Sequence, residues 1–305
     1  SDPLTGRNYD HRKAALERRL RYLAGHFGID VIGFAIMSNH FHLVLRNRPD
    51  VVDTWSDTEV ARRWLSICPL RRADANEPAE PTTAELDTIR NCPDRLAEIR
   101  TRLSDISWLM RMLAQSVARQ ANREDDITGR FWEGRFKAVR LCDEAALLAC
   151  LAYVDLNPIR AGVALTPEAS DFTSVQRRIE AVLGDNPDAD GWLAPLTIDE
   201  AATGPLPSAV PQRASDKGCL PLSVDEYLTL LDWTGRQLAA GKWGAIPRNL
   251  APILQRLGIG DSHWLMLAHH FGRLFHRVAG TPATLRRQSF RRNFHHGRAD
   301  LLTAA

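Results

Sequence analysis

The 305-residue sequence lacks the features that mark a disulfide scaffold, a zinc domain or a membrane protein. Its five cysteines are widely spaced and none forms a C-x-x-C pair, which favours free thiols in a reducing compartment. No apolar run approaches the roughly 18 residues that a membrane span needs. The first residues carry no signal-peptide pattern. We therefore expect a cytoplasmic protein that does not enter a membrane.

A strong net charge is also missing. The formal net charge of +2 is too small to imply a polyanionic partner by itself. The charge is uneven, because residues 231–305 contain eleven Arg or Lys against three Asp or Glu. This basic end is either a phosphate-facing surface or a solvated helix face. No loop resembles the glycine-rich phosphate-binding loop of nucleotide-dependent enzymes, so no nucleotide cofactor is expected.

Hydrophobic periodicity predicts a mixed α and β protein. A helix is expected over Asp10–Phe27, followed by strands Val31–Met37 and His40–Leu45 joined by Ser38–Asn39. Residues 131–141 alternate apolar and polar side chains and are compatible with a strand. The other expected helices are Thr58–Ile67, Arg95–Arg123, Asp143–Asn157 with Asp143 as its cap, Val224–Ala240, Asn249–Leu257, Ser262–Ala279 and Thr284–Phe294.

His40 and His42 are the first candidate site residues. Side chains two apart on a strand share one face, so the two imidazoles would lie side by side while Phe41 points into the core. Such a pair can chelate a divalent metal. Two histidines at this spacing on a strand are more often ordinary polar residues, so the pair needs support from the rest of the chain. No Asp follows in the H-x-H-x-D arrangement of a dinuclear metallohydrolase, which makes that class a weak alternative.

Tyr153 and Asn157 lie four residues apart, which places them on one face of the expected helix. A tyrosine can be a nucleophile once its phenol is polarised or deprotonated. The asparagine carbonyl is a hard ligand suited to Mg²⁺ or Mn²⁺. The same spacing arises without any site if Tyr153 belongs to an amphipathic surface and Asn157 is a C-cap.

Three ordered segments extend this pattern: MSNHFHLVL at 37–45, GRFWEGRFKAVRL at 129–141 and YVDLNPIRAGVA at 153–164. Together they resemble the single-tyrosine HUH transposases, and among these the REP-associated tyrosine transposases. The resemblance covers roughly Asp10–Asp50 and Leu103–Ser174. It implies that the histidine pair and Asn157 hold Mg²⁺ or Mn²⁺, with Asp155 ranked below Asn157. It also implies that Tyr153 attacks single-stranded DNA, which forms a 5′-phosphotyrosine and frees a 3′-hydroxyl.

The fold implied by the resemblance is α+β: a ferredoxin-like HUH domain, whose antiparallel sheet has helices on one face, plus a helical C-terminal extension. We expect the HUH domain at 1–49 and 95–180, an insertion or mobile connection at 50–94, a linker at 181–223 and a basic helical accessory domain at 224–305. The strand that precedes the first helix in this family is not expected here, because SDPLTGRNY does not read as a strand. Its loss would expose an edge beside the histidine strand.

The expected partner is single-stranded or hairpin DNA in the bacterial cytoplasm, at the nucleoid, with a homodimer left open. Basic side chains track a DNA backbone while aromatic rings stack on unpaired bases. The predicted DNA-contacting residues are Arg119, Arg123, Arg130, Trp132, Arg135, Lys137, Arg140, Arg287 and Arg291. Phe136 is expected in the core, and the role of Trp132 stays open between core and contact. The alternative function is a catalytically inactive, truncated DNA-binding remnant.

A second group of histidines lies near the C-terminus, where one helix is expected to carry all four. These residues are His263, His269, His270 and His276. A metal site there lacks a carboxylate or cysteine partner, so the group is expected to be structural.

Overall fold

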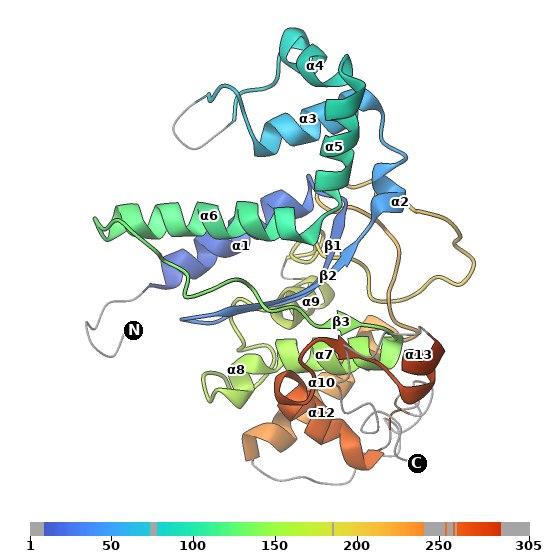
Figure 1. Cartoon of the computed structure of the whole chain (residues 1–305). Helices are drawn as coiled ribbons and strands as arrows, with labels where there is room; N and C mark the ends of the chain where they lie inside the picture. The colour runs from blue at the N-terminus through green and yellow to red at the C-terminus, as the bar shows by residue number, and fades with distance from the viewer. Residues whose placement is uncertain are drawn as a thin grey trace.

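The chain folds into a mixed α and β structure in which helices surround a small antiparallel sheet (Figure 1). The computed structural model describes residues 9–73, 78–184, 186–240, 254, 259 and 261–287. Within these residues there are twelve helices, one antiparallel hairpin and one short parallel strand pair. No described helix has the length and apolar character needed to cross a membrane.

The antiparallel hairpin consists of β1 (Ile29–Ile36) and β2 (Phe41–Asn47). In its register Ala35 faces His42, and the amide of Met37 donates to the carbonyl of His40 at 2.9 Å across the turn. The two predicted strands are thereby confirmed. Every residue of β1 is buried, whereas β2 is mostly half-buried.

Helices cover both faces of the hairpin. One face packs on α1 (Asp10–Ala24), which lies along α6 (Ile106–Glu124); the other packs on α7 (Glu144–Asp155) (Figure 1). This corrects the expectation of helices on one face only. Burial on both sides explains why β1 reads as an almost continuous apolar run, because an alternating pattern arises only when one face is in water. The sheet is therefore a central layer between two helical layers.

The edge of β1 that β2 leaves open is covered by irregular backbone and by α9 (Ser174–Leu183). The amide of Ile36 donates to the carbonyl of Phe172 at 3.0 Å, and the amide of Ala194 donates to the carbonyl of Val31 at 2.9 Å. Buried backbone groups need such partners, so these bonds replace a neighbouring strand. In the described part of the chain, β2 pairs only with β1.

Residues 95–123, expected as one helix, form parts of two. Helix α5 (Pro93–Leu103) ends before Ser104, and α6 starts where the side chain of Asp105 accepts a hydrogen bond from the amide of Ser107 at 2.6 Å. The acidic N-cap explains the break, because it favours a new helix start at this point. The first predicted helix also ends earlier than expected, at Ala24 rather than Phe27.

The segment 50–94, expected as an insertion or mobile connection with one helix, is largely helical outside residues 74–77. Its elements are α2 (Pro49–Val52), α3 (Asp57–Ile67) and α4 (Thr83–Arg90). Helix α4 was not predicted, although a capping box between Thr82 and Glu85 marks its start. The segment packs on α5 and shares the hydrophobic cluster of α1 and β1.

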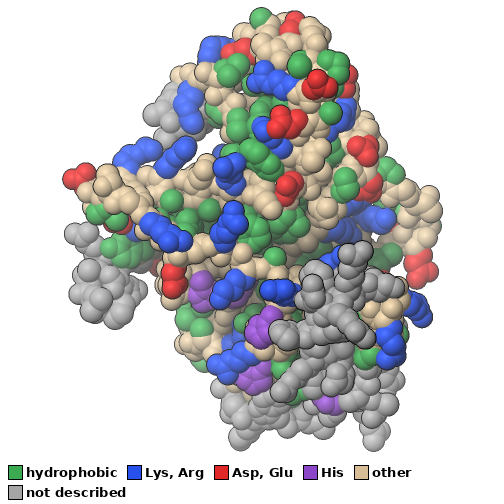
Figure 2. All heavy atoms as spheres, in the orientation of Figure 1, with side chains coloured by type: hydrophobic (Ala, Val, Ile, Leu, Met, Phe, Trp, Pro, Cys, Tyr) green, Lys and Arg blue, Asp and Glu red, His purple; other side chains and the backbone are tan. Residues whose placement is uncertain are grey.

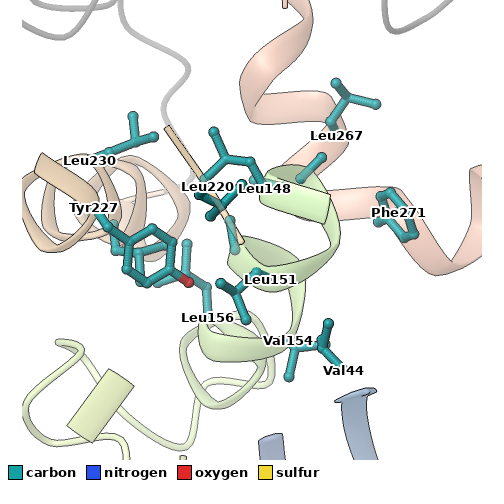
Figure 3. Close-up of a cluster of buried hydrophobic side chains, with 14 of the residues drawn as sticks. Val44, Leu148, Leu151, Val154, Leu156, Leu220, Tyr227, Leu230, Leu267 and Phe271 are labelled. Atoms are coloured by element: carbon teal, nitrogen blue, oxygen red, sulfur yellow. The ribbon is translucent and has the colours of Figure 1, made fainter. Parts of the chain in front are cut away.

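Helix α7 is buried along most of its length. It starts at the predicted cap Asp143, whose carboxylate accepts a hydrogen bond from the amide of Ala146 at 2.9 Å. Helices α10 (Val224–Ala240) and α12 (Asp261–Leu274) pack with it into one hydrophobic cluster (Figure 3). The C-terminal helices therefore share the core of the helix that carries Tyr153.

The segment 131–141 is mostly irregular, which corrects the expected strand. Only β3 (Arg140–Leu141) is a strand, and it pairs in parallel with β4 (Val278–Ala279), just before α13 (Pro282–Arg287). Residues 186–223, within the expected linker, contain no helix or strand but pack on the body, since Trp192 is 1% exposed. The expected helix 249–257 lies mostly outside the described residues.

The close approach of α7 to β1 depends on a glycine and gives a stability prediction. A Cβ atom on Gly33 would lie 2.2 Å from Cδ1 of Leu151 and 3.1 Å from Oγ of Ser174. We expect Gly33→Ala to lower the free energy of unfolding by about 1–3 kcal/mol, measured by urea denaturation. The control is Gly134→Ala, where a Cβ has no heavy atom within 4 Å. Equal stability of the two variants would contradict the described packing of α7 on β1.

Candidate functional site

His40 directly precedes β2 and His42 is its second residue, and their rings are nearly perpendicular with centroids 5.0 Å apart. Their strand face is that of Val44, which belongs to the cluster under α7 (Figure 3). Phe41 points to the other face, where its ring lies 5.5 Å from the ring of Trp132. The structure thus places the two imidazoles side by side, on the side of the hairpin that faces α7.

Tyr153 reaches this pair from α7. Its ring centroid lies 5.7 Å from that of His42, so the three rings form one continuous group. On its other side the tyrosine ring lies 6.2 Å from Phe271 of α12. The packing of α7 on the hairpin thereby joins residues that are far apart in the sequence.

Arg160 fixes the position of Tyr153, and the sequence did not predict it as a site residue. Its guanidinium carbon lies 3.6 Å from the centroid of the tyrosine ring, within the range of a cation–π contact. Its Nη2 donates to the carbonyl of Tyr153 and its Nη1 to the carbonyl of His269, both at 3.0 Å. The available signal was its place in the YVDLNPIRAGVA segment at 153–164.

Asn157 does not lie on the helix of Tyr153, which corrects the prediction. Helix α7 ends at Asp155, and Asn157 begins the short helix α8 (Asn157–Arg160). The following residue, Pro158, has no amide hydrogen to continue the helical bonding. Asn157 is 7% exposed, and its Nδ2 has no hydrogen-bond partner in the described structure. No hydrogen bond of the described residues links it to the histidine pair.

Asp155 is fully buried and binds other parts of the fold. Its carboxylate accepts hydrogen bonds from the hydroxyl of Ser174, from the amide of Val175 at 3.0 Å and from the hydroxyl of Tyr227 at 2.6 Å. Burial raises the pKa of Asp155, against the lowering by Arg178 and by these donors. The residue connects α7 to α9 and α10, which makes it a structural group rather than a free metal ligand.

The environment of the histidine pair favours neutral imidazoles. Burial, followed by the positive charges of His40 and Arg160, lowers the pKa of His42 to about 4. Burial and then Arg160 also lower the pKa of His40. A neutral imidazole keeps the lone pair that a metal requires, so the pair can bind a cation at neutral pH without first losing protons.

A hollow of about 250 Å³ lies beside Tyr153, between α7, α8 and α12. Its lining residues are Tyr153, Arg160, His269, His270 and Arg273. A Cβ atom on Gly272 would lie 2.8 Å from the hydroxyl oxygen of Tyr153, so α12 approaches the phenol closely. Figure 2 shows histidine and basic side chains gathered on this part of the molecule. Nothing in the hydrophobic periodicity of residues 261–274 predicted that α12 would reach this site.

The histidines of the C-terminal region are arranged differently from the prediction. Helix α12 ends at Leu274, so it carries His263, His269 and His270 but not His276. The rings of His269 and His270 lie 4.2 Å apart. The described residues contain no group of three or more His, Cys, Asp and Glu side chains placed to hold a metal.

The predicted DNA-contacting residues near α6 and β3 lie at the surface. Those that are exposed are Arg119, Arg123, Arg130, Arg135, Lys137, Arg140 and, on α13, Arg287. Trp132 is half-buried, and its Nε1 donates to the carbonyl of Ala114 at 2.9 Å. Phe136, expected in the core, is 46% exposed instead, because no strand forms here to direct it inward. Arg291 lies outside the described residues.

Comparison with protein-family models, with curated proteins and with solved structures gives no match.

The environment of His42 predicts a specific pH dependence. The His42 imidazole has its ordinary pKa of 6.5 in the unfolded chain and a pKa of about 4 in the folded protein. The stability contributed by neutral His42 is therefore full above pH 6.5 and is lost as the pH falls towards 4. We expect the His42 ring signals in an NMR titration to have their midpoint near 4, and His42→Gln to weaken the loss of stability over this range. A midpoint near 6.5 would contradict the buried position of this ring.

Proposed function

We propose that the protein cleaves and rejoins single-stranded DNA by attack of Tyr153 on a phosphodiester, as the resemblance to single-tyrosine HUH transposases suggests. The observation that carries the proposal is the contact between Tyr153 and the His40–His42 pair, with ring centroids 5.7 Å apart at the nearest ring. Nothing in the local sequence of either segment requires them to meet. A nucleophile beside a chelating pair is the arrangement that phosphoryl transfer needs.

The donor set fits a divalent metal at the histidine pair. His40 and His42 would hold the ion through neutral imidazole nitrogens, as their lowered pKa values allow. Asn157 remains the proposed third ligand through its side-chain carbonyl oxygen, a hard donor of the kind that Mg²⁺ and Mn²⁺ prefer. When bound, Mg²⁺ or Mn²⁺ would act as a Lewis acid on the phosphate oxygen.

The protein residues have separate parts in the proposed reaction. The phenol oxygen of Tyr153 forms a bond to phosphorus while the bond from phosphorus to the 3′-oxygen breaks. The phenol loses its proton, and the departing 3′-oxygen gains one. Arg160 holds the ring by its 3.6 Å contact and adds a positive charge beside the phosphate. The tyrosyl ester conserves the energy of the broken bond, so a second strand can be joined without ATP.

We further propose that the hairpin, α1 and α7 are the core of a ferredoxin-like HUH domain. An α+β fold in which the histidine pair flanks the first residue of β2 supports this assignment. The alternative is a DNA-binding remnant without catalytic activity. The two-stranded sheet favours the alternative, because in the described residues no further strand braces β2.

Covalent trapping tests the proposal. We expect the protein, incubated with labelled single-stranded DNA hairpins and Mn²⁺, to form an adduct that survives denaturation. Tyr153→Phe should reduce the adduct to background, because it removes the nucleophilic oxygen. Tyr22→Phe is the matched control, since the hydroxyl of Tyr22 donates to the carbonyl of Ser66 on the other side of the sheet.

Two outcomes would contradict the proposal. An adduct that persists in Tyr153→Phe would show that another residue is the nucleophile. The sequence contains four tyrosines, so the other three could be replaced in turn. Binding of hairpin DNA without any adduct would favour the remnant.

A further inference from the structure

The C-terminal helix α12 forms one wall of the space around Tyr153. Phe271 packs beside the tyrosine ring, and Gly272 lies against the phenol oxygen. Arg160 connects the two elements, because its guanidinium donates both to the backbone of Tyr153 and to the backbone of His269. The site is therefore built from the segment that resembles the transposases together with a helix that lies outside that resemblance.

The hollow in this space suits a small anion better than a large ligand. Its volume of about 250 Å³ is below the roughly 300–1,000 Å³ of sites for drug-sized molecules. Two of its lining residues, Arg160 and Arg273, are cationic, and none of the described lining residues is acidic. Among the described residues, no carboxylate forms an ion pair with either arginine. Two guanidinium groups at one hollow, with no ion-paired carboxylate among the described residues, favour an anionic ligand.

The two arginines differ in burial and in hydrogen bonding, which indicates different parts. Arg160 is largely buried and its position is fixed by two backbone acceptors and by the ring of Tyr153. Arg273 is exposed at the mouth of the hollow. Guanidinium groups pair with phosphate oxygens through two parallel hydrogen bonds, which sets both position and orientation.

We propose that Arg273 binds a phosphodiester of single-stranded DNA in this hollow, while Arg160 holds Tyr153 facing that phosphate. The inference rests on the proposed function for the identity of the ligand. It adds that α12 is part of the substrate site rather than part of a separate accessory domain. Arg160 is a positioning residue, and Arg273 is a substrate-binding residue.

Equilibrium binding tests this assignment without any cleavage. All proteins carry Tyr153→Phe, and binding of fluorescein-labelled oligothymidylate is followed by anisotropy over a series of salt concentrations. We expect Arg273→Gln to weaken binding about tenfold, as for the loss of one charged hydrogen-bonding group. The slope of log K against log salt should fall by about 0.7, the value for one phosphate contact on a single strand.

Two further variants serve as controls. Arg18→Gln removes an exposed arginine of α1, on the opposite side of the sheet, and should leave affinity and slope unchanged. Arg273→Lys keeps the charge and loses the paired hydrogen bonds, so it should retain the slope while weakening the affinity. Thermal melting of each variant shows whether the fold is retained.

The result that overturns the inference is an Arg273→Gln protein that binds oligothymidylate as tightly as the Arg18→Gln control. If inorganic phosphate then still shifts the NMR signals of His269 and His270 in an Arg273-dependent manner, the hollow takes free phosphate rather than DNA. None of these binding measurements depends on the phenol of Tyr153. Failure of the Arg273 assignment can therefore be distinguished from failure of the adduct experiment.

Discussion

The packing of helix α7 against the β1–β2 hairpin is the constraint on which the rest of the structure depends. Gly33 lets the helix approach, since any larger residue would meet Leu151 at 2.2 Å. Val44, two residues after His42, and Val154, which directly follows Tyr153, belong to the same hydrophobic cluster (Figure 3). Buried apolar contacts of this kind tolerate little displacement, because interiors are close-packed. The packing of the core beneath the candidate site therefore determines the positions of the site residues.

A second interaction extends this core to the C-terminal helices. Asp155 accepts hydrogen bonds from α9 and α10 at the end of α7, and Arg160 connects α8 to α12. Asp155 is fully buried and Arg160 is partly buried, so breaking either connection would leave a polar or charged atom without its partner. The C-terminal helices consequently stabilise the position of Tyr153, whether or not they also contact a substrate.

Local patterns in the sequence predicted the local structure of the site. The hairpin, the shared face of His40 and His42 and the cap Asp143 follow from alternation and capping, which act over a few residues. The break between α5 and α6 was missed, because an acidic cap outweighed the continuous apolar periodicity, and α7 ends at Asp155 rather than at the expected Asn157. The exposed Phe136 was missed because alternation indicated a strand that does not form.

Contacts between segments that are far apart in the sequence could not be predicted from local sequence patterns. The approach of α12 to Tyr153 depends on which helix packs on α7. Hydrophobic periodicity predicts that a segment is helical but not which other helix it packs against. The sequence identified Tyr153 and the histidine pair through an ordered set of motifs, but it did not identify Arg160 or Arg273 as their neighbours. Arg160 lies within the segment 153–164, whereas Arg273 lies outside all three segments and reaches the site through tertiary packing alone.

Paramagnetic broadening by Mn²⁺ tests most directly whether the histidine pair and Tyr153 form one metal-dependent site. Ring signals of His40, His42 and Tyr153 would be followed during titration with Mn²⁺, with the His40→Ala, His42→Ala double variant as the control. The account predicts early and selective broadening of these three rings, which disappears for Tyr153 in the double variant. Broadening centred elsewhere, or broadening of Tyr153 that persists without the histidines, would contradict it.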